Sequence, residues 1–421
     1  MKTGRPEDVL GRLRPGQRVY VQGGPAECAA FSDLLQTNPG AARGVELWSC
    51  LIPGNNTFDY GSLPDGPKLV TFMASPALER SIASEQTRVD VMPYSEIAVR
   101  LAQTDFDIAI LHSAPPDGNG RCSFGIGCEA PGIVWPRAKD RIVFLTQKMP
   151  AIRRSPSIVL KDVDLAIPID WPLLSPARTK AGSSVLEAIA RRAAELVPDG
   201  AVIQSGIGEA PGAVVAALKD RRRLRFHSGM VTPEYRLLDE AGAFEAGGDN
   251  VAGIAWGGPD FYQWLASSDI ARFCSALVTH NRQTIGGMSN FASIGSAIEV
   301  DLKGNLNLEW VGSRRVSSIG GAPDYVAAAN ASLGGRSIIA LPSTAASGAS
   351  RIVQQLPPHA ISIPGDLADA IVTEHGVAQL RGLSPEARAR SLIDIAAAQH
   401  RAALAGPPPK GRHGIGEIAG S

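Results

Sequence analysis

A glycine-rich loop with one carboxylate is the feature of the sequence best suited to chemistry. Gly206, Gly208 and Glu209 follow an apolar run typical of a strand, and Pro211 suits the first turn of the helix expected next. Glycines let a ligand approach the backbone closely, and the free N–H groups at a helix N-terminus attract an anion or an oxyanion. A carboxylate there stays ionised, which makes Glu209 a candidate general base. The same pattern also suits a plain tight connection whose carboxylate only favours the helix dipole.

The loop is a poor match to a dinucleotide-binding fingerprint. A proline stands where the third glycine is required, and no acidic residue ends the following strand. The loop therefore indicates close approach of some other anionic ligand.

Several segments resemble motifs of the acetyl-CoA hydrolase/transferase family, which includes 4-hydroxybutyrate CoA-transferases and acetate or succinate CoA-transferases. They keep the order and spacing of that family between about residues 107 and 385. The segments are 115–123 (PPDGNGRCS), 204–211 (QSGIGEAP), 296–305 (SAIEVDLKGN), 320–325 (GGAPDY), 337–344 (SIIALPST) and 372–382 (VTEHGVAQLRG).

The resemblance implies an α/β fold of two similar CoA-transferase-type domains, each with an open, mainly parallel sheet, and an active site between them. It also implies an enzyme that acts on acyl-CoA, with coenzyme A as part of the substrate and no other cofactor, and a homodimer. The residues expected to bind CoA are Gly206, Gly208, Gly320, Gly321, Asp324 and Arg336. Because CoA carries several phosphate charges, Arg314, Arg315 and Arg381 are further candidates for holding it.

Two positions depart from the family pattern. Members of the family have a strand that ends in His-Ser/Thr-Glu-Met, and its glutamate attacks the acyl-CoA carbonyl to give an anhydride and then a glutamyl-CoA thioester. The corresponding segment here is 227–230 (HSGM), so Gly229 occupies the nucleophile position. Gly295 occupies the position of an asparagine thought to stabilise the oxyanion, and one such donor is typically worth about 100- to 1,000-fold in rate. Without both groups, transfer through an enzyme-bound thioester is not expected.

Three functions remain open at this point. The chain could bind acyl-CoA and perform general acid–base chemistry, as a decarboxylase or a hydrolase of a carbon–carbon bond; it could activate water directly against the thioester; or it could be a non-catalytic acyl-CoA-binding subunit. A conventional transferase with a relocated glutamate is a further alternative. Glu209 is the leading base, and Glu209→Gln is expected to remove most of the activity while leaving stability and CoA binding nearly intact. The other candidates are His227, Glu234 and, as an alternative nucleophile, Cys28.

Strands and helices alternate along the chain in the way that parallel sheets covered by helices require. The predicted strands are 18–22, 45–51, 68–73, 107–111, 142–145, 201–204, 224–227, 251–255, 276–279, 337–340 and 360–363, with helices over 185–196 and 213–220. Residues 296–310 predict an antiparallel hairpin at a sheet edge. Strand–glycine–helix patterns at 19–24 and 202–208 suggest an internal duplication.

The proline-rich stretch 167–178 predicts a linker between an N-terminal domain (1–178) and a C-terminal domain (179–405), followed by a flexible tail (406–421). Lys plus Arg and Asp plus Glu both number 41, so the charge balance favours neither nucleic acid nor a membrane surface as a partner. Five scattered cysteines show neither disulfide nor zinc spacing, and no metal site is expected. Together with an N-terminus unlike a signal peptide, this predicts a cytoplasmic protein.

Overall fold

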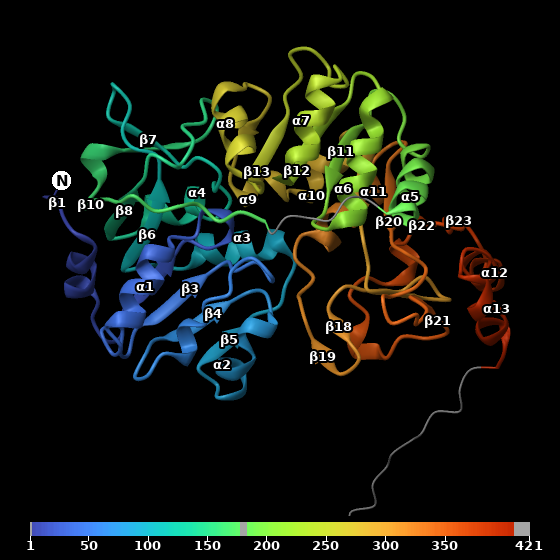
Figure 1. The fold of residues 1–421 in the computed structure, drawn as a ribbon, viewed down its shortest axis with the longest axis horizontal. Coiled ribbons are helices and arrows are strands. Elements are labelled where there is room, and N and C mark those ends of the chain that lie inside the picture. Colours follow the sequence, from blue (N-terminus) through green and yellow to red (C-terminus); the bar gives the residue numbers. More distant parts are fainter. Residues whose placement is uncertain (1, 177–182, 408–421) are drawn as a thin grey trace, which may run out of the picture.

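The computed structural model describes residues 2–176 and 183–407, which form two eight-stranded sheets. All neighbouring strands of the first sheet are parallel. In spatial order they are β1 (Lys2–Thr3), β10 (Leu165–Pro168), β8 (Asp140–Leu145), β6 (Ile108–Ser113), β2 (Arg18–Val21), β3 (Glu46–Ser49), β4 (Lys68–Thr71) and β5 (Thr87–Val89). This sheet lies in the blue to green part of the chain in Figure 1.

The second sheet is parallel except for its last pair, β22 and β23. Its strands in spatial order are β14 (Arg272–Phe273), β13 (Val251–Ala255), β12 (Arg225–Val231), β11 (Val202–Ser205), β15 (Phe291–Gly295), β20 (Arg336–Ala340), β22 (Ala370–Thr373) and β23 (Gly376–Gln379). It occupies the green to red half of Figure 1. The prediction of an α/β fold with two open, mainly parallel sheets is therefore confirmed.

Helices cover both faces of each sheet because alternate strand residues carry apolar side chains in both directions. On β11, Ile203 packs under α5 (Ser184–Ala194) and α6 (Glu209–Ala217), whereas its neighbour Val202 packs under α10 (Arg282–Gly286) and α11 (Ala322–Ala331). The helices are α1 (Ala29–Thr37), α2 (Glu79–Ala83), α3 (Tyr94–Gln103), α4 (Pro131–Val134), α5 (Ser184–Ala194), α6 (Glu209–Ala217), α7 (Pro233–Glu240), α8 (Pro259–Ser267), α9 (Ala276–Thr279), α10 (Arg282–Gly286), α11 (Ala322–Ala331), α12 (Pro385–Asp394) and α13 (Ala398–Ala405).

The two halves share one apolar core, which runs from Tyr20 in the first sheet to Phe226 in the second. Backbone hydrogen bonds also join them: Gly127 forms a bridge to Ile254 of β13, and the Cys128 N–H donates to the Gly253 carbonyl at 3.1 Å. The segment before α4 is thus fastened to the second sheet.

Most predicted strands coincide with observed ones, but two predictions are wrong. Residues 276–279 form α9, because a four-residue apolar run cannot be told from a buried helical turn by periodicity alone. Residues 360–363 contain no strand; Pro358–Ala360 is a 3-10 turn and Ile363 makes one isolated bridge to Leu306. Strands β15 and β22 were not predicted.

The predicted hairpin at 296–310 exists as β16 (Glu299–Asp301) and β17 (Leu306–Asn307), which pair antiparallel. It belongs to a separate small sheet, where β16 also pairs with β21 (Ile352–Val353), so it is not an edge of either large sheet. Two further pairs are β7 (Arg121–Ser123) with β9 (Ser157–Val159), and β18 (Trp310–Val311) with β19 (Arg314–Arg315).

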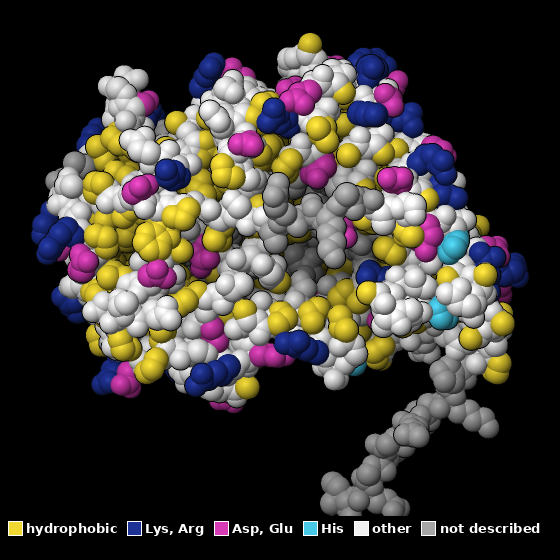
Figure 2. Space-filling model, viewed as in Figure 1, with side chains coloured by type: hydrophobic (Ala, Val, Ile, Leu, Met, Phe, Trp, Pro, Cys, Tyr) yellow, Lys and Arg dark blue, Asp and Glu magenta, His cyan; other side chains and the backbone are white. Residues whose placement is uncertain are grey.

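The predicted domain boundary at 178/179 and the tail beyond residue 407 lie outside the described residues. Within the described ones, each helix is too short or too polar to cross a lipid bilayer. Figure 2 shows basic and acidic side chains mixed over the visible face, without a region of one sign. An anionic ligand must therefore be held by local groups.

Candidate functional site

The second sheet reverses its strand order between β11 and β15, and this reversal locates a candidate site. Strands β12, β13 and β14 follow β11 in turn toward one edge of the sheet. Strand β15 then lies on the other side of β11, and β20, β22 and β23 continue from it toward the opposite edge. Ligands of open α/β sheets bind beyond the carboxyl ends of the strands at such a switch point. Here those ends carry Gly206, directly after β11, and Gly295, the last residue of β15; the Gly206 N–H donates to the Ile294 carbonyl at 2.8 Å.

A cavity of about 510 Å³ lies at this switch point and draws its lining from both halves of the chain. Part of the lining is bare backbone, because six of its residues are glycines: Gly206, Gly208, Gly229, Gly295, Gly320 and Gly321. Gly208 has φ +128°, a conformation that residues with a side chain rarely adopt, and it leads directly into α6. A ligand in this cavity can therefore approach the main chain and the N-terminus of α6.

Gly229 lies inside β12 at a point where a side chain has no room. A Cβ built on it would lie 2.8 Å from His280 Cε1 and 3.0 Å from the Tyr325 hydroxyl. Both neighbours are almost fully buried. The space that a longer residue at 229 would enter is thus filled by a histidine ring and a phenol.

His280 is held firmly in this position. Its ring stacks on Tyr94 with centroids 4.6 Å apart, and its Nδ1 lies 2.9 Å from the Thr279 hydroxyl oxygen. Burial lowers the pKa of His280 to about 3, so the imidazole is neutral at physiological pH. The Tyr325 hydroxyl donates to the Thr279 carbonyl at 2.9 Å, which fixes the second neighbour.

Glu129 brings a carboxylate from the first half of the chain to the same place. It precedes α4, lines the cavity and is only 6% exposed. A Cβ at Gly253 of β13 would lie 2.5 Å from Glu129 Cγ and 2.6 Å from Oε1, so the side chain rests directly on that glycine. Burial raises the pKa of Glu129 to about 8, against a smaller lowering by the Tyr94 hydroxyl. The carboxyl group can therefore accept or give a proton near neutral pH.

Several sequence relatives of the chain are named as enzymes that transfer or hydrolyse CoA thioesters. Residues 257–406 match the family described as acetyl-CoA hydrolase/transferase C-terminal domain. The 4-hydroxybutyrate coenzyme A transferase of Clostridium kluyveri is 34% identical over 306 residues, which cover 71% of each chain.

The chain belongs to the acetyl-CoA hydrolase/transferase family.

The solved structures agree. RipA from Yersinia pestis superimposes with a TM-score of 0.87 at 26% identity, covering 96% of each chain. The 4-hydroxybutyrate CoA-transferase from Porphyromonas gingivalis gives a TM-score of 0.78 at 25% identity, again over 96% of each chain. The chain is therefore an enzyme of the CoA-transferase/hydrolase family with the CoA-transferase fold.

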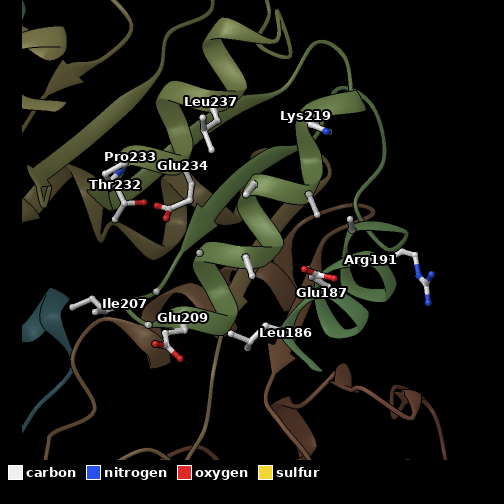
Figure 3. Close-up of a pocket in the computed structure, with 18 of the residues that line it drawn as sticks. Leu186, Glu187, Arg191, Ile207, Glu209, Lys219, Thr232, Pro233, Glu234 and Leu237 are labelled. Carbon is white, nitrogen blue, oxygen red and sulfur yellow. The ribbon is translucent and has the colours of Figure 1, made fainter. Parts of the chain in front are cut away.

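Within this family fold, the predicted base Glu209 is the first residue of α6 and is exposed. It lines the cavity and also borders a second, larger hollow beyond the glycine loop, between α5, α6 and α7. Figure 3 shows this second hollow, with Glu209 at one end and Glu234 on the side of α7.

The other predicted catalytic residues lie away from the cavity lining. His227 is buried, and its Nε2 lies 3.1 Å from the Val278 carbonyl; burial lowers its pKa. Glu234 lines the second hollow and faces Gly212 of α6. Cys28 is fully buried, and burial raises its pKa to about 12, which suppresses the thiolate.

Of the residues expected to bind CoA, the four glycines line the cavity, whereas Asp324 and Arg336 make internal contacts. Arg336 and Arg381 both pair with the buried Asp369, at 3.2 Å each. Arg314 pairs with Glu79 of the first half, and Arg315 pairs with Glu309. The cation that does line the cavity is Arg351, which was not predicted.

Four residues that line the cavity with Gly229 were not predicted as site residues: Glu129, Tyr94, His280 and Tyr325. They come from four separate segments, and no spacing in the sequence relates them. The run GIGCEAPG at 125–132 has a carboxylate between small residues, as the loop at 206–211 does, and this is the sequence pattern that could have indicated Glu129.

Proposed function

We propose that the chain hydrolyses the thioester of an acyl-CoA by general acid–base chemistry, without a glutamyl-CoA intermediate. The observation that carries the proposal is Gly229: β12 presents no carboxylate to the cavity, and the place is filled by His280 and Tyr325. The family includes hydrolases as well as transferases by its own description.

The cavity supplies the groups that such a reaction needs. Glu129 and Glu209 are the carboxylates among its described lining residues, and either can act as a base toward water. The glycine loop and the start of α6 offer N–H groups for an oxyanion. Arg351 can pair with an anionic part of the ligand.

The purified chain should release free CoA from at least one acyl-CoA without added acceptor. Incubation with a panel of acyl-CoAs, carboxylated ones included, and measurement of free thiol and CO2 tests this. Free thiol that appears without acceptor supports hydrolysis. Release of CO2 with the thioester retained would replace it with decarboxylation, and the absence of both products would favour a binding subunit.

A second candidate function is conventional CoA transfer with a relocated glutamate. The position of Glu129 favours it, because a carboxylate from the segment before α4 lines the same cavity as Gly229. Turnover that requires an added carboxylate acceptor, with formation of its CoA thioester, would support this candidate against hydrolysis.

A further inference from the structure

We propose that Glu129, supplied by the first half of the chain, is the proton-transfer residue of the cavity. This inference rests on the proposed function and deepens it, since it assigns the acid–base chemistry to one carboxylate. Glu129 lines the same cavity as the glycine loop, but it lies in a segment that the sequence motifs did not mark as functional.

The local packing is built around this side chain. Gly229 and Gly253 lie on adjacent strands, between the paired residues Ser228–Ala252 and Met230–Ile254. A Cβ at Gly253 would lie 2.6 Å from Glu129 Oε1 and 2.7 Å from the Gly229 carbonyl oxygen. The missing side chain of Gly253 therefore leaves the space that the Glu129 side chain occupies, next to the Gly229 carbonyl of β12.

The backbone at Glu129 and just before it is fixed to the second half of the chain, which places the side chain at the cavity. Before it, the Cys128 N–H donates to the Gly253 carbonyl at 3.1 Å, and the Ala255 N–H donates to Ile126 at 3.0 Å. At the residue itself, the Ala276 N–H donates to the Glu129 carbonyl at 3.1 Å. Three bonds to the second half hold this segment, and a rigid base is what proton transfer requires.

The step balances with water as the other reactant. The ionised Glu129 takes a proton from a water molecule as the water oxygen bonds to the thioester carbonyl carbon. When the carbon–sulfur bond breaks, the electron pair goes to sulfur and the proton passes from Glu129 to it. The products are a carboxylic acid, which ionises, and free CoA, and Glu129 is ionised again.

Glu209 differs from Glu129 in its surroundings. It is exposed at the start of α6, where bulk water competes for its proton, whereas Glu129 is enclosed. A base is most effective when its pKa lies near the working pH, and burial raises the pKa of Glu129 to about 8.

Glu129→Gln should lower kcat/KM by about 100-fold or more, the usual value of a positioned base, while the affinity for CoA stays within about twofold. The glutamine has nearly the same shape and removes the cost of burying an ionisable group, so thermal unfolding should be unchanged or shifted upward. Glu129→Asp, which keeps a carboxylate but shortens its reach, should retain part of the activity. Glu96→Gln on α3, an exposed carboxylate outside the cavity, is the matched control and should behave as wild type.

The pH profile separates proton transfer from a structural role. Because the ionised form is the base, kcat/KM of the wild type should rise with pH and level off above about pH 8. The ionisable groups around Glu129 are neutral over this pH range, because burial raises the pKa of the tyrosines and thiols and lowers that of the histidine. These groups are Tyr20, Cys50, Tyr94, Cys128, His280 and Tyr325. Glu129→Gln should abolish this rise, and Glu129→Asp should keep it.

Turnover by Glu129→Gln at more than half the wild-type rate, or an unchanged pH rise, would overturn the assignment while leaving the proposed function intact. A covalent adduct at Glu129 would also overturn it. Absence of thioester turnover in the wild type itself would contradict the proposed function and this inference together.

Discussion

Gly229→Glu should fail to restore covalent CoA transfer and should destabilise the fold. The Cβ alone would lie 2.8 Å from His280 Cε1 and 3.0 Å from the Tyr325 hydroxyl, and His280 cannot move without losing its stacking on Tyr94. Overpacking of this kind costs about 1–3 kcal/mol of unfolding free energy. The inserted carboxylate would also lie near Glu129, which makes ionisation of both unfavourable. Denaturant unfolding and an acceptor-dependent transfer assay measure the two effects.

Gly295→Ala is the matched control for this variant. It adds a side chain in the same cavity, but its Cβ would meet only an Ile339 methyl group at 3.4 Å, an ordinary contact. Its unfolding midpoint should stay near that of the wild type. A stable Gly229→Glu protein that gains transfer activity would show that the cavity still accommodates the family nucleophile.

Asp324→Ala should lower the free energy of unfolding by about 2–4 kcal/mol, because it removes the acceptor of several charge-assisted hydrogen bonds. The carboxylate is fully buried and accepts from the Ser95 N–H at 2.9 Å, the Ser95 hydroxyl at 2.6 Å and Arg282 Nε at 2.6 Å. Ser95 belongs to α3 of the first half, so Asp324 ties the two halves together beside the cavity. We expect activity to fall with stability.

Glu240→Ala provides the comparison for Asp324→Ala. Glu240 pairs with Arg236 on the surface of α7 at 2.7 Å, and exposed pairs of this spacing contribute only about 0.3–0.5 kcal/mol. Guanidinium unfolding of both variants gives the difference directly. If Asp324→Ala lowers the free energy of unfolding no more than Glu240→Ala does, the association of the two halves does not depend on the Asp324 carboxylate.

The sequence predicts the fold well where strands are long and apolar. The β13 strand at 251–255 was predicted with its observed bounds, and β2, β8, β11 and β20 within a few residues. The failures have local causes: β15 reads FASIG, with small residues of low strand propensity, and the run at 276–279 is too short to show a period.

Only half of the cavity could be predicted from the sequence. The loop at Gly206–Gly208 and the positions of Gly229 and Gly295 follow from motifs that are contiguous in the chain. Glu129 and His280 reach the cavity through tertiary packing between the two halves, which no local pattern encodes. Burial against Gly253, a tertiary contact, is what distinguishes Glu129 from the other carboxylates of the chain.

The most direct test is mass spectrometry of the protein treated with borohydride during steady-state turnover of an acyl-CoA. Borohydride reduces a glutamyl thioester or anhydride to an alcohol and so marks the residue that carried it. If a glutamate only accepts and returns a proton, no covalent intermediate forms. Every glutamate-containing peptide, including those with Glu129 and Glu209, should then keep its mass while free CoA accumulates. A reduced glutamate in any of these peptides would contradict the account and show that covalent chemistry persists at another carboxylate.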